Sequence, residues 1–184
     1  MPNWCENNIK ILGPADDIRK FITKIQDPDD GTVFKIAESI MPMPTILGDR
    51  APQEDEEKAQ KAIDATGFRD WYEWANSDTN WGTKWGDCDT DLYFDDTQID
   101  GYYTTAWSPL SVAFWEEASR QFKSLRIVIG YREEGMNYEG AYAFYGGECY
   151  YDRSQEGSVL YKEAMESLDT VSYTHLTLPT IYSV

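Results

Sequence analysis

Asn80-Trp81-Gly82-Thr83-Lys84-Trp85-Gly86-Asp87 is the most informative stretch of this chain, and Thr105-Ala106-Trp107-Ser108-Pro109 follows it further along. In the first stretch, two tryptophans stand four residues apart around Gly-Thr-Lys. In the second, a tryptophan precedes Ser-Pro, a pair typical of a helix start because serine caps helices and proline suits their first position. The two stretches indicate an architecture, and neither contains a pattern that specifies a reaction.

The tryptophans of these stretches allow two interpretations. Trp81 and Trp85 share a helical spacing, and Gly82 lets another backbone approach closely, which favours a place in the core. Trp107, directly before the expected helix cap, is also expected to be a core anchor. Alternatively, Trp81, Lys84 and Trp85 form an aromatic platform with a cation, suited to base stacking or ligand capture. We favour the core and keep the platform as the alternative.

The N-terminal part of the chain predicts a strand, a helix and a second extended segment. Residues 7–12 alternate between polar and apolar, which predicts a strand with Ile9 and Ile11 on one face. A helix follows Pro14, and its apolar residues recur at helical spacing. They are Ile18, Phe21, Ile22 and Ile25. Residues 32–40 are expected to be extended.

The rest of the chain predicts a helical insert and then a second set of strands. The insert covers about residues 45–80, with a helix from Glu56 to Trp74 that breaks near Gly67. A helix is expected to begin at Ser108-Pro109 and to bury an apolar stripe made of Val112, Phe114, Trp115, Ala118 and Phe122. Strands are expected at residues 91–94, 101–107, 125–131, 138–145 and 148–152, and a short helix at 158–168.

This order of elements predicts an α+β fold, because an antiparallel sheet with helices packed on one face satisfies it. The second half alone provides most of a split βαβ unit, the motif of ferredoxin-like folds. We therefore expect residues 1–170 to form a single ferredoxin-like α+β domain with a helical insert at about 45–80. The remaining residues, 171–184, are expected to be a non-native tail. Residues 171–180, VSYTHLTLPT, resemble a translated sequencing-library adapter.

The charge of the chain limits its partners. The formal net charge is −17, which makes direct nucleic-acid binding unlikely because contacts with phosphate need local cations. Self-repulsion that keeps the protein in solution explains this charge. A sharper hypothesis is an acidic surface that imitates nucleic acid and occupies a basic partner. No stretch is apolar enough to cross a membrane, and three cysteines without a metal-binding spacing fit a reducing cytoplasm.

The sequence offers little catalytic chemistry. Its one histidine, His175, lies in the suspected tail, so a Cys–His pair, a three-histidine zinc site and a haem ligand are not expected. Asp87-Cys88-Asp89-Thr90-Asp91 opens like a calcium loop, but Leu92 and Gln98 occupy the positions that need glycine and glutamate. Glu133 and Glu134 are neighbours on a strand, so they face opposite sides. We expect no enzyme, no cofactor and no metal.

Several stretches together resemble one known family, the YubB ferredoxin-like domain proteins of bacterial phages and conjugative plasmids. The matching stretches are Met1 to Asn7, Ile40 to Pro44, Asn80 to Trp85, Thr105 to Pro109, Tyr131, Glu133 to Gly135, and Gly140. The resemblance covers about residues 1–150. It implies a ferredoxin-like α+β fold and an origin in a mobile element or prophage. The family name describes shape, so it implies no iron–sulfur cluster. The function of the family is uncharacterised, so the resemblance implies no catalytic residues.

These observations predict an accessory protein that binds a macromolecule, most plausibly a host protein. Counter-defence or host takeover through the acidic surface is the specific version of this hypothesis. The candidate binding residues are Trp81, Lys84, Trp85, Trp107 and Tyr142, the last taken from a tyrosine-rich strand. The alternative is a small-ligand-binding protein or enzyme with a pocket near the Trp-Gly-Thr-Lys-Trp motif.

Overall fold

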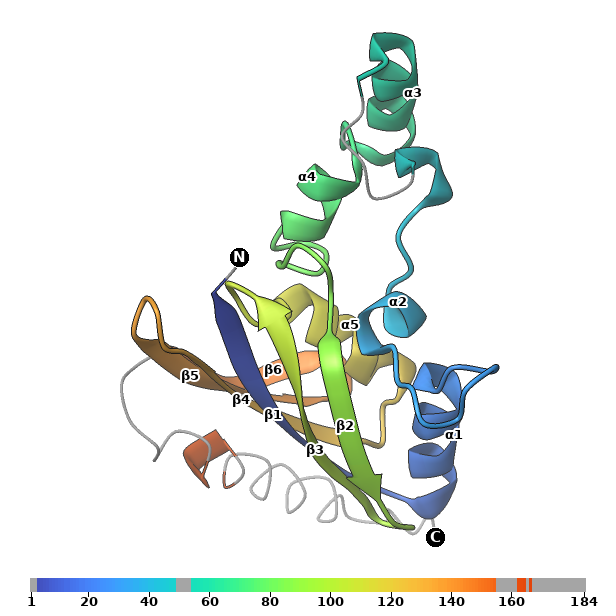
Figure 1. Ribbon diagram of the computed structural model, residues 1–184. Helices are drawn as coiled ribbons and strands as arrows, with labels where there is room; N and C mark the ends of the chain where they lie inside the picture. Colours follow the sequence, from blue (N-terminus) through green and yellow to red (C-terminus); the bar gives the residue numbers. More distant parts are fainter. Residues whose placement is uncertain (1–2, 49–53, 155–161, 165, 167–184) are drawn as a thin grey trace, which may run out of the picture.

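A computed structural model describes residues 3–48, 54–154, 162–164 and 166, which form an α+β fold (Figure 1). Its elements in chain order are β1 (Trp4–Leu12), α1 (Ala15–Ile25), α2 (Ile36–Ile40), the 3₁₀ helix η1 (Thr45–Leu47), α3 (Glu56–Thr66), α4 (Trp71–Asn76), β2 (Cys88–Phe94), β3 (Gln98–Ala106), α5 (Val112–Gln121), β4 (Arg126–Glu133), β5 (Tyr138–Tyr145) and β6 (Glu148–Ser154).

The strands form one sheet, and β1 lies in its middle. Within the described residues the sheet has six strands in the order β2-β3-β1-β4-β5-β6, and all neighbours are antiparallel. Alternate residues of β1 are buried, which confirms that Ile9 and Ile11 share the core face. Ile9 faces Gly101 on β3 and Ile129 on β4.

Helix α1 confirms its predicted stripe, because all four apolar residues at helical spacing are buried. The extended segment predicted for residues 32–40 is wrong. Only Phe34 makes an isolated bridge, and α2 follows it. Helix α2 forms here because a residue far along the chain, Asp87, caps its first turn. The carboxylate of Asp87 accepts hydrogen bonds from the backbone N–H of Ile36 at 3.0 Å and of Ala37 at 2.7 Å. These bonds satisfy donors at the start of α2, and the local sequence contains no sign of them.

The insert carries α3 and α4, which stand beyond the end of the sheet where β1 begins (Figure 1). Gly67 ends α3 in a left-handed conformation, as the predicted break requires. Asp55 and Asp70 cap the two helices through backbone N–H groups. The short 3₁₀ helix η1 lies at the start of the insert.

A set of hydrogen bonds joins the two stretches that dominate the sequence. The Ser111 N–H donates to the Trp81 carbonyl at 2.8 Å, and its hydroxyl donates to the Asn80 carbonyl at 2.5 Å. The Thr83 hydroxyl, fully buried, donates to the Ala106 carbonyl at 2.8 Å. We call these contacts between residues 80–83 and 105–111 the clamp. A buried polar group that loses its partner costs about 1–3 kcal/mol, so the clamp tolerates few changes.

The clamp also corrects the predicted start of α5. Ser108 is not the helix cap, because its hydroxyl donates to the Gly82 carbonyl at 2.6 Å. Ser111 caps the helix instead, and its oxygen accepts from the Phe114 N–H at 3.0 Å. The buried residues of α5 are Phe114, Trp115, Ala118 and Ser119. Val112 and Phe122, at its two ends, are only partly buried.

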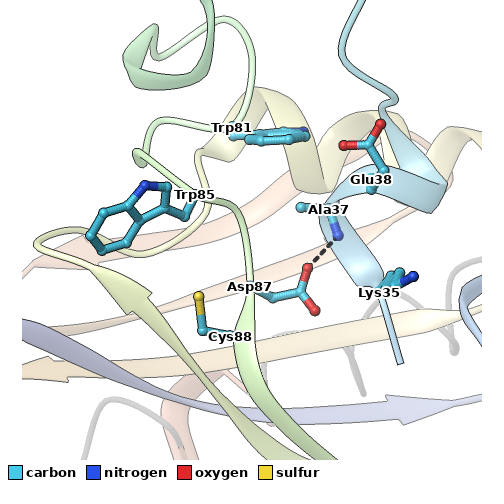
Figure 2. A pocket seen from close by; sticks show the side chains of 7 residues that line it. All are labelled: Lys35, Ala37, Glu38, Trp81, Trp85, Asp87 and Cys88. Atoms are coloured by element: carbon cyan, nitrogen blue, oxygen red, sulfur yellow. Dashed lines mark hydrogen bonds between the residues drawn. The ribbon is translucent and has the colours of Figure 1, made fainter. Parts of the chain in front are cut away.

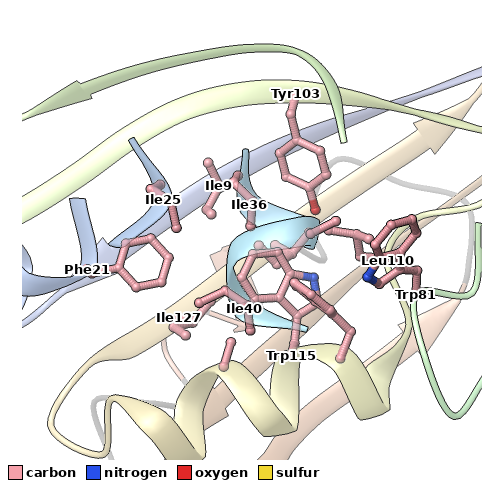
Figure 3. Close-up of a cluster of buried hydrophobic side chains, with 14 of the residues drawn as sticks. Ile9, Phe21, Ile25, Ile36, Ile40, Trp81, Tyr103, Leu110, Trp115 and Ile127 are labelled. Carbon is pink, nitrogen blue, oxygen red and sulfur yellow. The ribbon is translucent and has the colours of Figure 1, made fainter. Parts of the chain in front are cut away.

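The core lies between the sheet and the helices α1, α2 and α5. Figure 3 shows Trp115 of α5 and Ile36 of α2 among side chains from β1, β3 and β4, with Trp81 at one side. On the opposite face of the sheet, Val128, Ala141 and Ala143 are buried together with Ala164. Residues 162–164 and 166 are helical, whereas the rest of the predicted 158–168 helix and the whole of 171–184 lie outside the described residues.

No helix within the described ranges has both the length and the apolar character needed to cross a membrane.

Replacing Gly82 with alanine tests the close approach inside the clamp. Gly82 has a φ of 72°, and a Cβ there would lie 2.9 Å from the Ser111 Cβ. Backbone strain and overpacking each cost about 1–3 kcal/mol. We expect Gly82→Ala to lower the free energy of unfolding by about 2–4 kcal/mol in urea denaturation followed by circular dichroism.

Gly67→Ala is the matched control. Gly67 also has a positive φ, 83°, but a Cβ there would meet nothing within 4 Å. It should lose about 1 kcal/mol from backbone strain alone. Equal losses in the two variants would show that the contact with Ser111 carries no weight.

Candidate binding surface

Trp81 belongs to the core, as predicted. Only 1% of its surface is exposed, and its indole Nε1–H donates to the Met41 carbonyl at 2.8 Å. Its ring meets that of Trp74 edge to face, with centroids 5.0 Å apart. Trp81 therefore joins α2 and α4 to the clamp, and its side chain is not available to a macromolecular partner.

Trp107 is not the expected core anchor, because 39% of its surface is exposed. Its backbone is held instead: the N–H donates to the Asn3 carbonyl at 2.9 Å, and the carbonyl accepts from the Tyr138 hydroxyl. Its φ is 68°, an uncommon conformation for a residue with a side chain. These contacts turn the indole outward. The Ser-Pro pair after Trp107 could not predict them, because they come from distant residues.

The other two residues of the platform hypothesis meet outside the core. The ammonium of Lys84 lies 4.7 Å from the ring centroid of Trp85, 5.9 Å from that of Trp107 and 5.6 Å from that of Tyr72. Such cation–π contacts contribute about 0.5–1 kcal/mol each at exposed sites. Lys84 and Trp85 therefore lie together as the alternative expected, and Trp107 takes the place assigned to Trp81.

Two aromatic residues that sequence reasoning missed complete this surface. Trp4 lies with its ring centroid 6.1 Å from that of Trp85, and Tyr72 belongs to α4. Both are 43% exposed. We call the group of Trp4, Tyr72, Lys84, Trp85 and Trp107 the aromatic patch. The outward position of Trp4 in the alternation of β1 was the available signal, whereas nothing local placed Tyr72 beside Lys84.

Tyr142 lies apart from the aromatic patch. It is on the core side of β5, opposite Ile129, and its ring packs 5.0 Å from Tyr131 and 5.9 Å from Phe144. Burial raises the pKa of Tyr142 well above its usual value. Its ring therefore serves packing between the sheet and the core, and the structure does not bring it together with the other four candidates.

A cavity of about 340 Å³ lies beside the motif, between the clamp and α2. It is lined by Lys35, Ala37, Glu38, Trp81, Trp85, Asp87 and Cys88 (Figure 2). Its charged groups are mostly engaged already. Asp87 caps α2, and the Lys35 ammonium pairs with Asp27. Glu38 also interacts with the Lys35 ammonium, because its negative charge contributes to the raised pKa of Lys35.

The nucleophilic and acidic groups near the clamp are held in structural roles. Burial raises the pKa of the Cys5 thiol to about 12, and burial also raises that of Cys149 to about 11. Glu133, the last residue of β4, is buried, while Glu134 is exposed in the turn that follows and not on the strand where it was expected. Within the described residues, no three histidine, cysteine or acidic side chains gather in a group that could hold a metal ion.

The fold resembles one solved by crystallography. The crystal structure of a protein api92 from Yersinia pseudotuberculosis, of the family DUF1281, matches with a TM-score of 0.51 and 11% sequence identity. The match covers 86% of this chain and 99% of that chain. At this identity the similarity concerns the fold alone. No protein-family model and no curated protein match the chain.

Thiol labelling tests the access to the cavity and the burial of Cys5. The thiolate is the reactive form, so Cys5 and Cys149 should be nearly inert at pH 8. Cys88 is partly exposed and lines the cavity. We expect iodoacetamide to modify Cys88 at least about tenfold faster than Cys5 in the native protein, measured by peptide mass spectrometry. In denaturant the three thiols should react at similar rates. Native labelling of Cys5 as fast as Cys88 would contradict this arrangement.

Proposed function

We propose that this protein is a ferredoxin-like member of the YubB family, of phage or plasmid origin, that acts in the cytoplasm of a bacterial host by binding a host protein. Apart from the helices α2, η1, α3 and α4, the chain runs β1-α1-β2-β3-α5-β4, which is the order of a ferredoxin-like unit. In the sheet, β3 separates β1 from β2, as a split βαβ requires. β5 and β6 extend this unit on one side.

The aromatic patch is the observation that carries the binding proposal. Trp4, Tyr72 and Trp107 each expose about two-fifths of their surface, and they come from distant parts of the chain. Exposed aromatic groups that gather at one place are typical of interfaces with other macromolecules. Lys84 contacts the rings of Tyr72 and Trp107, and Trp4 packs beside Trp85. These contacts hold the rings in place before binding, which reduces the entropy lost on association.

The charge of the chain suggests the chemistry of the partner. A formal net charge of −17 favours association with a basic protein and opposes contact with a phosphate backbone. Proteins that handle nucleic acid carry such basic surfaces. Counter-defence or host takeover by occupying one of them is the specific role that we propose. The protein would perform no reaction, because the acidic and thiol groups near the clamp serve packing and capping.

Capture from a bacterial lysate tests this function. Immobilised full-length protein, in nuclease-treated lysate, should retain a basic nucleic-acid-handling protein. Replacing two rings of the aromatic patch, Tyr72→Ala with Trp107→Ala, should reduce its recovery at least about tenfold, as expected when two interface anchors are lost. The control is Tyr93→Ala with Tyr102→Ala, which removes two exposed rings from β2 and β3 outside the patch. Failure to retain any basic partner, or equal losses in both variants, would refute the proposal.

A second candidate function is a small-ligand site, and the cavity beside Trp85 favours it. The cavity has the size of small-molecule pockets. Lys35→Ala with Glu38→Ala changes its lining and leaves the aromatic patch intact. If this variant lost the binding of a small ligand while the Tyr72→Ala, Trp107→Ala variant kept it, the cavity would be the functional site. We prefer the aromatic patch because the cavity's charged groups are largely engaged within the protein.

A further inference from the structure

The cavity between the clamp and α2 is continuous with the aromatic patch through Trp85. This residue lines the cavity, and its ring centroid lies 6.1 Å from that of Trp4 and 4.7 Å from the Lys84 ammonium. Figure 2 shows the Trp85 and Trp81 rings on two sides of the cavity. A partner that covers the aromatic patch therefore also reaches the mouth of the cavity.

The inner wall of the cavity is apolar. Trp81 and Ala37 are buried, and they present an indole ring and a methyl group. The polar atom of Trp81, its indole N–H, is already bonded to the Met41 carbonyl. The half-buried Trp85 ring and Cys88 thiol continue this lining toward the surface. An apolar group that fills the space is removed from water, which favours its binding.

The charges in the lining are compensated within the protein. The Asp87 carboxylate accepts two hydrogen bonds from backbone N–H groups of α2 and one from the Thr90 hydroxyl at 2.7 Å. The Lys35 ammonium pairs with Asp27 and also interacts with Glu38. A charged ligand would lose its hydration here and meet groups that already have partners, so an uncharged group fits the cavity better.

Close packing behind the cavity fixes its shape. Gly86 stands between Trp85 and Asp87 with a φ of 72°. A Cβ at this position would lie 2.7 Å from the Ala37 Cβ and 3.6 Å from the Trp81 ring. The backbone thus passes directly against the inner wall. A preformed pocket of this kind loses less entropy on binding than one that must first be ordered.

The two indoles favour an aromatic occupant. Aromatic rings attract one another through edge-to-face and offset contacts, in addition to the effect of burial. The volume of about 340 Å³ gives room for one large side chain. Interfaces concentrate their binding energy in such anchors, which fill pockets at the centre of the contact. The net charge of −17 favours basic residues on either side of the anchor.

We propose that this cavity receives an aromatic side chain of the host protein, flanked in that protein by basic residues. The ring lies between the Trp81 and Trp85 indoles, and the flanking cations face the acidic surface around the rim. This inference rests on the proposed function, because it names the group that anchors the partner beside the aromatic patch.

Pentapeptides that differ only at their central residue test the inference. Arg-Arg-Phe-Arg-Arg, Arg-Arg-Leu-Arg-Arg and Arg-Arg-Ser-Arg-Arg, each amidated and labelled with a fluorophore, are titrated into the full-length protein and followed by fluorescence anisotropy. We expect the phenylalanine peptide to bind at least about tenfold more tightly than the serine peptide, because its ring is buried. It should bind at least about twofold more tightly than the leucine peptide, because contacts between rings add to burial.

The Cys88 thiol allows the cavity to be filled in the folded protein. Benzyl methanethiosulfonate attaches a benzyl group to it through a disulfide, and methyl methanethiosulfonate attaches only a methyl group. The benzyl adduct should weaken binding of the phenylalanine peptide at least about tenfold, and the methyl adduct less than about twofold. Dithiothreitol should restore binding. Cys88→Ser treated with the benzyl reagent is the control for modification elsewhere.

Three outcomes would overturn the inference: equal binding of the phenylalanine and serine peptides, equal binding of the phenylalanine and leucine peptides, or unchanged binding after the benzyl adduct has formed. N-acetyl-phenylalanine amide that binds as tightly as the phenylalanine peptide would also overturn it and assign the cavity to a free small ligand. In each case, capture of a basic host protein that still depends on Tyr72 and Trp107 would leave the proposed function standing. Loss of that capture as well would remove both.

Discussion

Hydrogen bonds between residues 80–83 and 105–111 hold the rest of this structure in place. The clamp joins the end of β3 to the turn that follows the insert, and Ser111 then starts α5 at the same point. The insert is tied to it by the N–H groups of Gly82 and Thr83, which donate to the carbonyls of Ser77 and Ala75. Sheet, insert and α5 therefore meet in one short segment, and Asp87 extends this connection to α2.

The backbone around the clamp decides which indoles are buried and which are exposed. It draws Trp81 inward, where the indole N–H finds the Met41 carbonyl. It turns Trp107 outward, because the N–H and the carbonyl of that residue are bonded to Asn3 and Tyr138. The same stretch of backbone thus contributes to both the core and the aromatic patch. The aromatic patch is therefore a consequence of how the backbone is held at this point, and its rings are in place without a partner.

The sequence predicted the elements whose stability is local. The alternation in β1 and the helical spacing from Ile18 to Ile25 depend on periodicity, and both were confirmed. The errors concern residues whose conformation depends on distant partners. Helix α2 is capped by Asp87, which lies far along the chain. The Ser108 hydroxyl donates to the Gly82 carbonyl and does not cap the helix that follows it. A serine suits either role, so its type alone could not decide between them.

The candidate site was predictable only in part, for the same reason. Lys84 and Trp85 were named from their motif, but Tyr72 and Trp4 reach them through tertiary packing. Trp107 was assigned to the core because most tryptophans near a helix start are buried. Its positive φ and its two backbone hydrogen bonds reverse that preference, and neither can be read from residue type.

Native-state hydrogen exchange measures the central claim most directly. If the clamp holds sheet, insert and α5 together, the amides of Ser111 and Thr83 should exchange only through global unfolding. Their opening free energies should then equal those of the β1 amides to within about 1 kcal/mol. Exchange of Ser111 and Thr83 through a local opening several kcal/mol easier than that of β1 would contradict the account.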